Sequence, residues 1–353
     1  MYAAVWLTLG ACISALLVLG ITPGWRQVPV PAMSAGSDQR PTSRGDAVAY
    51  YSWVKPLLIA LVCALVVGTR VGVPGTDTYT YMRSYQLAPV DLAYALALKD
   101  PGYQVLIVLA KWVGLQYGSF QFVIALITSY LYFLFIFRYS PNIWLSTILY
   151  FFMGLFAQQT NGMRQMLAAG VLLLSFHHIT QGRFWRFLPL CLVAAPLHAS
   201  ALAMIPAYFF LRSRPWNPRT LFILFGALAG FMLLDPLVET TRSYWLQSSL
   251  PYASALARLD TSFEGANPVR VLVHAAPALV ALALARSRHD DSVYERVLVN
   301  GAVLEAVFYI LALYNWVFAR LAFYTWPLVL LLIPHVLRDL RLRPRALAAL
   351  LIV

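Results

Sequence analysis

Apolar runs that approach the ~20 residues needed to cross a bilayer recur along this chain. Hydrophobic residues make up 61% of the sequence and charged residues only 11%, a balance that excludes an ordinary soluble domain. Backbone that faces lipid must be helical or belong to a closed barrel, and these runs are too long for barrel strands. The sequence therefore predicts an all-α fold, a polytopic helical bundle integral to a membrane.

The formal net charge is +12, and in a soluble protein a basic balance can indicate nucleic-acid binding. Here most arginines lie in short loops between apolar runs, as the positive-inside rule describes for cytoplasmic loops. We therefore expect no nucleic-acid partner. The three cysteines lie inside apolar runs without metal-binding spacing, so we expect no metal site. Residues 1–21 lack a basic start and a cleavage site, and we expect a first span there instead of a signal peptide.

The basic loops predict a topology for a single polytopic domain over residues 1–353. We expect a flexible cytoplasmic loop at residues 22–53, a periplasmic loop with an interfacial helix at residues 74–118, and a second periplasmic loop at residues 235–268. In this arrangement the arginine-rich loops all fall on the cytoplasmic side.

The apolar run at residues 187–211 is flanked by arginines at both ends, so a single crossing would leave one basic cluster outside. Pro196 lies in the middle of the run, and proline breaks helices. We therefore predict a re-entrant helix–break–helix hairpin with His198 at its tip, on the outer side. His198 is either a structural histidine, a general base or a donor to a phosphate.

Three expected helix starts share one pattern, an asparagine followed by an arginine within a turn or two. They are Asn161–Arg164, Asn267–Arg270 and Asn315–Arg320. Asparagine is a common N-cap, whereas arginine near the positive end of a helix dipole is unfavourable unless an anion binds there. The topology places all three starts on the outer side, which predicts a shared phosphate site. The alternative is arginines that snorkel at a membrane interface.

Asp77, Tyr81 and Tyr85 recur at a spacing of four residues, so they share one face of a helix. A carboxylate beside aromatic rings suits sugar recognition. The alternative is that Thr76 or Asp77 merely caps the helix.

Other polar side chains lie at depths where polar groups are costly. Gln158 and Gln165 accompany Arg164, and Glu305 lies inside an expected span. Glu305 is either functional or paired with an arginine on a neighbouring helix. The predicted fold class is thus an all-α polytopic integral membrane helical bundle with re-entrant or short helices and an outer-face polar cavity.

Five short motifs follow one another along the chain: Arg70 and Gly72 ahead of Gly75–Tyr81, then Pro101–Tyr103, Arg164–Ala168, Ala195–Ala201 and Ala319–Tyr324. In this order and spacing they resemble the EpsG-like family of bacterial polysaccharide polymerases, the Wzy-type proteins. Asp100 stands where the family usually has Glu, and Leu197 where it usually has Phe. We expect neither departure to touch the candidate residues.

The resemblance implies polymerisation of undecaprenyl-diphosphate-linked oligosaccharide repeat units into O-antigen, capsule or exopolysaccharide. The enzyme would be a metal-independent glycosyltransferase without a cofactor, in the bacterial inner membrane, with its active site facing the periplasm. Its partners would be the lipid-linked glycans, membrane lipid, a chain-length regulator and a flippase.

The catalytic candidates are His198 and Asp77, as rival bases, and Arg164 and Arg320, on the donor diphosphate. The candidates for substrate binding are Arg70, Tyr81, Tyr85, Gln158, Gln165, Arg270 and Tyr324.

Two other functions remain open on the sequence. A flippase for the same lipid-linked sugar would also need arginines and a cavity, but it should show internal repeats and charges spread through the bilayer depth. An O-antigen ligase would also use outer-face arginines and a histidine.

Overall fold

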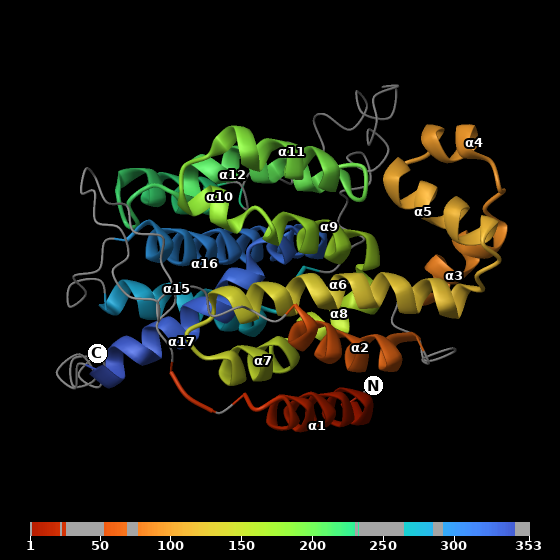
Figure 1. The fold of residues 1–353 in the computed structure, drawn as a ribbon. Coiled ribbons are helices and arrows are strands. Elements are labelled where there is room, and N and C mark those ends of the chain that lie inside the picture. Colours follow the sequence, from red (N-terminus) through yellow and green to blue (C-terminus); the bar gives the residue numbers. More distant parts are fainter. Residues whose placement is uncertain are drawn as a thin grey trace, which may run out of the picture. The chain divides into compact units, whose positions relative to one another are not determined.

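The computed structural model describes residues 2–21, 23–25, 53–68, 77–229, 232, 265–284 and 292–342. Every regular element in that part of the chain is a helix, which confirms the predicted all-α class (Figure 1). The chain divides into two compact units, unit 1 (Met1–Tyr208) and unit 2 (Phe209–Val353). Arg70 and most of the loops expected at residues 22–53 and 235–268 lie outside the described residues.

Unit 1 is built from many short helices around one long one. They are α1 (Tyr2–Val18), α2 (Val54–Gly68), α3 (Thr78–Leu87), α4 (Leu92–Ala97), α5 (Pro101–Trp112), α6 (Tyr117–Tyr139), α7 (Ile143–Phe152), α8 (Leu155–Asn161), α9 (Met163–Leu173), α10 (Phe176–Thr180), α11 (Phe184–Ala194), the 3₁₀ helix η1 (Ala199–Ala203) and α12 (Met204–Leu211), whose last residues pass into unit 2.

The long helix α6 organises unit 1, with α2 and α9 packed along it (Figure 1). Its buried positions include small or hydroxyl side chains, Ala125, Thr128 and Ser129, which let neighbouring helices approach closely. Helix α2 ends in such a contact, because a Cβ added at Gly68 would lie 2.6 Å from Cβ of Phe122.

Helix α6 is the one described helix with the length and apolar composition to cross a bilayer. The helices Trp316–Tyr324 and Trp326–Arg338 are long and apolar enough to cross a bilayer only if they are taken together as one span. The chain is bent by 63° at the break between them. The other apolar helices have 10–17 residues, because breaks such as the one at Gly154 divide the runs. The full set of expected spans stays a prediction.

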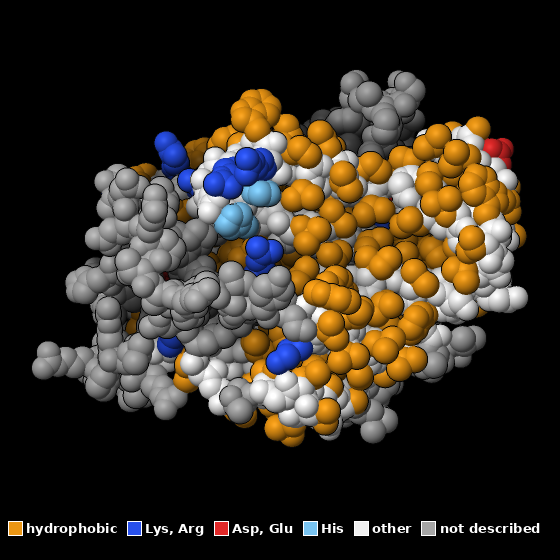
Figure 2. All heavy atoms as spheres, in the orientation of Figure 1, with side chains coloured by type: hydrophobic (Ala, Val, Ile, Leu, Met, Phe, Trp, Pro, Cys, Tyr) orange, Lys and Arg blue, Asp and Glu red, His pale blue; other side chains and the backbone are white. Residues whose placement is uncertain are grey.

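The two ends of α6 differ in chemistry. At its C-terminal end, Arg138 interacts electrostatically with His177 of α10. Arg183, which precedes α11, interacts with the same histidine. At its N-terminal end, Tyr117 hydrogen-bonds to the carbonyl of Thr78, at 3.4 Å. Figure 2 shows the histidine side chains beside basic ones in the upper part of this face, with further basic side chains separate from them, and apolar side chains over much of the right-hand part.

The segment expected to hold one interfacial helix contains three, α3, α4 and α5. Helices α3 and α5 contribute to an aromatic cluster in which the ring of Tyr85 lies 5.0 Å from Phe120 and that of Tyr103 lies 5.9 Å from Phe120. The hydroxyl of Tyr85 donates to the carbonyl of Leu115 at 2.5 Å. This cluster attaches α3 and α5 to the start of α6.

Unit 2 contains α15 (Pro268–Leu284), α16 (Val293–Ala312), the 3₁₀ helix η2 (Trp316–Tyr324) and α17 (Trp326–Leu342). Helix α16 packs against the other three. The amide of the fully buried Asn300 donates to the carbonyls of Phe210, Leu211 and Ser213, at 2.8–3.1 Å. These bonds satisfy carbonyls that the end of a helix leaves without partners.

We predict that Gly68→Ala destabilises the protein, because the new methyl group would overlap Phe122. Overpacking of this kind typically costs about 1–3 kcal/mol. Thermal unfolding in detergent measures it. The control is Gly10→Ala in α1, where a Cβ meets nothing within 4 Å. Equal melting temperatures for the two variants would contradict the close packing of α2 on α6.

Candidate active site

Helices α11 and α12 form the helix–break–helix arrangement predicted from the flanking arginines and Pro196. Cys191 Sγ, late in α11, donates to the carbonyl of Ala201 at 3.3 Å. Phe187, early in α11, packs on Tyr208 of α12, with ring centroids 4.9 Å apart. The chain therefore reverses direction between the two helices, and His198 lies at the turn.

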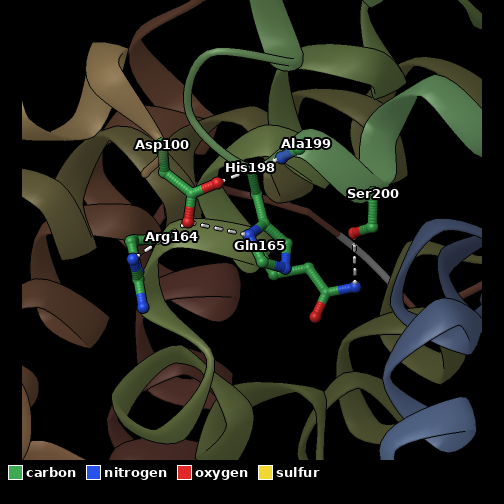
Figure 3. A network of polar contacts seen from close by, with 6 residues as sticks. All are labelled: Asp100, Arg164, Gln165, His198, Ala199 and Ser200. Carbon is green, nitrogen blue, oxygen red and sulfur yellow. Dashed lines mark hydrogen bonds and ion pairs between the residues drawn. The ribbon is translucent and has the colours of Figure 1, made fainter. Parts of the chain in front are cut away.

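The carboxylate of Asp100 is the centre of a polar network at this turn (Figure 3). Its Oδ2 lies 2.9 Å from Nη1 of Arg164 and 3.2 Å from Nδ1 of His198. The backbone N–H of Ala199 donates to Oδ1 at 3.2 Å. One buried carboxylate thus joins the start of α5, the start of α9 and the tip of the hairpin.

The backbone at the start of α5 explains how Asp100 reaches this position. The N–H groups of Gly102 and Tyr103 both point at the carbonyl of Pro196, at 2.9 and 3.4 Å. A Cβ at Gly102 would lie 2.8 Å from Cβ of Pro196, so only glycine permits this approach. Asp100 itself is left-handed, with φ of 56°, a conformation that costs on the order of 1–3 kcal/mol. Its three polar contacts offset that cost.

The electrostatic balance keeps Asp100 ionised. Burial alone would raise the pKa of its carboxyl, but the hydrogen bond and charge of His198, the charge of Arg164 and the N–H of Ala199 together hold that pKa below its ordinary value. An ionised carboxylate can only accept hydrogen bonds. Nδ1 of His198 therefore carries the proton, and in a neutral imidazole this leaves Nε2 as an acceptor.

Arg164 lies against aromatic rings as well as the carboxylate. Its guanidinium is 5.5 Å from the ring centre of Tyr81 and 5.9 Å from that of Tyr103, distances that allow cation–π attraction. The hydroxyl of Tyr81 also interacts electrostatically with the guanidinium. Because 29% of the Arg164 side chain is exposed, the positive charge is held in place yet open to a ligand.

Of the remaining unit 1 candidates, Gln165 lies beside this network. Nε2 of Gln165 donates to Oγ of Ser200 at 3.4 Å, which ties α9 to η1 (Figure 3). Tyr85 is 5% exposed and belongs to the aromatic cluster, while Gln158 is half-buried on α8. Asp77 occupies the N-cap position of α3 without a capping hydrogen bond from its side chain, and Thr76, the other possible cap, lies outside the described residues.

Two of the three predicted asparagine caps are present. Oδ1 of Asn267 accepts from the N–H of Val269 at 2.8 Å, and Oδ1 of Asn315 accepts from that of Val317 at 3.0 Å. The third prediction is wrong, because Asn161 is the last residue of α8 and Gly162 precedes α9. A kink between two short helices replaces the single helix start that the sequence pattern indicated.

Unit 2 carries the other two arginines of the pattern. Arg270 is exposed in the first turn of α15, and the guanidinium of Arg320 lies 4.4 Å from the ring centre of Trp316. Tyr324 is only 5% exposed. Since Arg164 belongs to unit 1, a phosphate site shared by all three arginines stays a prediction.

Asp100 is the site residue that the sequence pattern did not reveal. It is also one of the two positions where the chain departs from the family pattern, and the expectation that this departure does not touch the candidate residues is wrong. It touches both Arg164 and His198. The one sequence feature that could have pointed to Asp100 is its position as an acidic residue immediately before Pro101, at an expected helix start. The left-handed backbone that turns the carboxylate inward cannot be read from that pattern.

A family model matches residues 53–353, and its description is the EpsG family. The chain belongs to the EpsG family. This is the family of Wzy-type polysaccharide polymerases. No curated protein and no solved structure matches the chain. The whole Asp100 network lies inside the part that the EpsG family model matches.

We predict that Asp100→Asn lowers polymer synthesis by this EpsG-family chain more than tenfold while the protein still folds. Asparagine tolerates the left-handed backbone, but it removes the charge that holds Arg164 and orients His198. Charge-assisted hydrogen bonds contribute about 1.5–3 kcal/mol each. The control is Asp91→Asn, because the Asp91 side chain caps α4 and asparagine caps equally well. Equal polymer yields would show that the carboxylate charge is dispensable.

We also predict that Gly102→Ala reduces polymer synthesis, because the added methyl group would push Pro196, and with it His198, away from Asp100. The control is Gly226→Ala, at a position where a Cβ meets nothing within 4 Å. Polymer length on gels is the readout. An active Gly102→Ala variant would mean that the hairpin tip adjusts without harm.

Proposed function

We propose that this chain is a membrane glycosyltransferase that polymerises undecaprenyl-diphosphate-linked oligosaccharide repeat units at the periplasmic face of the bacterial inner membrane. The product would be an O-antigen, a capsule or an exopolysaccharide. The observation that carries the proposal is the contact of Asp100 with both His198 and Arg164, in a chain of the EpsG family.

The two partners of Asp100 suit the two ends of a glycosyl transfer. Nε2 of His198 would accept the proton of the acceptor hydroxyl as its oxygen bonds to the anomeric carbon of the donor sugar. The bond between that carbon and the phosphate oxygen breaks, and the electron pair leaves with the undecaprenyl diphosphate. Asp100 would stabilise the imidazolium that forms, as carboxylates do in histidine-dependent hydrolases.

Arg164 supplies positive charge for the leaving diphosphate. Stabilisation of developing charge by groups already in place is usually the largest catalytic contribution. The salt bridge to Asp100 and the ring of Tyr81 restrict the guanidinium before any ligand binds. This arrangement is compatible with a metal-independent reaction.

The two ends of α6 support the proposed orientation. Arg138 marks the basic end and Tyr117, beside α3, marks the other. The helix has 23 residues, roughly 35 Å at 1.5 Å per residue, against a hydrocarbon thickness of about 30 Å. With the basic end in the cytoplasm, as the positive-inside rule favours, the start of α6 lies at the periplasmic surface.

We predict that His198→Gln lowers turnover by about 10²–10⁴-fold, the usual contribution of a general base, while binding of the lipid-linked substrate is kept. Asp77→Asn is expected to remain active, because the general base in this proposal is His198, which Asp100 orients. Purified protein in nanodiscs with a lipid-linked repeat unit gives both readouts.

Other outcomes would identify other functions. If Asp77→Asn abolishes turnover and His198→Gln does not, the base is Asp77. If both variants are active, arginine stabilisation of the diphosphate carries the reaction alone. Transfer of glycan only to a non-carrier acceptor would indicate a ligase, and movement of the lipid-linked sugar across vesicles without chain growth would indicate a flippase.

A further inference from the structure

A basic surface patch lies at the C-terminal end of α6, and the proposed reaction does not use it. Its members are exposed arginines and half-buried histidines: Arg138 on α6, His177 and His178 on α10, and Arg183 and Arg186 around the start of α11. We call this set the basic patch. Figure 2 shows histidine side chains beside basic ones on the visible surface.

A tight turn holds α10 and the start of α11 together. Gly182 has a φ of 74°, the left-handed conformation in which glycine commonly ends a helix. In this turn the N–H of Gly182 donates to the carbonyl of Ile179 at 3.2 Å, and the N–H of Arg183 donates to that of His178 at 2.9 Å. The rings of His177 and His178 are 5.8 Å apart. The backbone therefore fixes Arg183 beside the two histidines.

Ring contacts bring the arginine of α6 to the same place. The ring of Phe176 lies 4.7 Å from that of Tyr139 and 5.2 Å from that of Phe135, both near the end of α6. His177 follows Phe176 on α10, and Arg138 precedes Tyr139 on α6. Packing of α10 on α6 thus places the second basic segment against the first.

The basic patch lacks the acidic partners that the other described histidines have. Those partners are seen in the pairs His198–Asp100, His274–Glu305 and His335–Glu295, with nitrogen–oxygen distances of 3.2, 2.6 and 3.8 Å. Glu305 therefore pairs with a histidine, and not with the arginine that the sequence allowed. No described carboxylate forms an ion pair with a histidine or an arginine of the basic patch.

The acidic residues of unit 1 lie near the opposite end of α6. Residues 1–208 contain no glutamate, and the described aspartates precede α3, α4 and α5. Helices α3 and α5 attach to the start of α6, and α4 packs on α5. The 23 residues of α6, roughly 35 Å of helix, separate that start from the basic patch. Salt screens exposed charges beyond about 8–10 Å, so these aspartates do not neutralise the patch.

The two histidines respond to this uncompensated charge. Burial lowers the pKa of His177, and the charges of Arg138 and Arg183 lower it further. Burial also lowers the pKa of His178, and the charges of Arg183 and Arg186 add to the effect. An anion bound beside these cations would raise both pKa values again. By linkage, protonation of the histidines then strengthens binding of the anion.

An exposed aromatic side chain places the basic patch at a membrane surface. Trp185, between Arg183 and Arg186 in the sequence, is 80% exposed, and tryptophan is enriched where membranes meet water. With the basic end of α6 in the cytoplasm, the patch faces the lipid headgroups of the cytoplasmic leaflet. Anionic lipids give that leaflet a negative surface potential, which attracts basic residues.

We propose that the basic patch binds the phosphate of an anionic phospholipid headgroup in the cytoplasmic leaflet, and that protonation of its histidines strengthens this binding. The arginines supply permanent charge and N–H donors for the phosphate oxygens. The histidines add positive charge as the pH falls. The patch is at the opposite end of α6 from the candidate active site, and it takes no part in the proposed glycosyl transfer.

The test titrates the full chain in detergent with phosphatidylglycerol and measures bound lipid by native mass spectrometry. We expect binding about tenfold tighter than that of phosphatidylcholine, whose headgroup has no net charge. Arg186→Gln should weaken phosphatidylglycerol binding roughly fivefold, the usual effect of one basic residue at an anionic surface. The matched control is Arg83→Gln, which removes the same charge from an exposed position on α3 and should bind as the wild type does.

The pH dependence of binding tests the histidines separately. The groups that face them from the neighbouring elements are Arg138 and Tyr139 of α6 and Arg183 and Arg186 around the start of α11. Because none of these titrates below pH 7, binding should strengthen severalfold from about pH 8 to about pH 5.5 through the histidines alone. The double variant His177→Gln, His178→Gln should bind normally at the higher pH and lose this response.

Three results would contradict the proposal. Equal affinity for the two lipids, or normal phosphatidylglycerol binding by Arg186→Gln, would show that the basic patch does not recognise the headgroup. A pH response that survives the loss of both histidines would exclude their part in binding. Displacement of the lipid by millimolar inorganic phosphate would assign the patch to a free anion instead of a headgroup. None of these measurements uses polymer synthesis, so the proposed function is tested independently.

Discussion

The ion pair between Asp100 and Arg164 is the interaction on which the candidate site depends. Each group alone would be costly at its depth, since a buried charge without a partner is strongly destabilising. Together they join α5 to α9, and the second contact of the same carboxylate oxygen brings in His198. The three elements of the site are therefore held by one side chain.

The double contact of this one carboxylate has a chemical consequence. The carboxylate holds a proton on one nitrogen of His198 and leaves the other nitrogen to accept one, while it also orients the guanidinium. A base for the acceptor and a cation for the leaving diphosphate are thus set in position by the same group. Tyr81 and Tyr103 complete the surroundings of the cation.

The sequence predicted the class of fold and the broad outline of the site for clear physical reasons. Apolar runs imply helices, and arginines on both sides of a run with a central proline imply the hairpin that carries His198. The sequence did not reveal Asp100, because its role depends on a left-handed backbone and on burial that arise only when α5 packs on the hairpin. The sequence pattern also wrongly predicted Asn161 as the N-cap of a helix, because a break between two short helices and the start of a single helix have similar sequence patterns.

The attachment of α5 to the hairpin uses backbone atoms, the N–H groups of Gly102 and Tyr103 and the carbonyl of Pro196. Gly102 itself must stay glycine, because a Cβ there would lie 2.8 Å from Cβ of Pro196, but main-chain contacts depend little on the side chains at neighbouring positions, which are therefore free to vary. Leu197 illustrates this freedom, because it needs only an apolar side chain to pack against the aromatic cluster. The reactive groups of the site can therefore stay constant while the walls around them change.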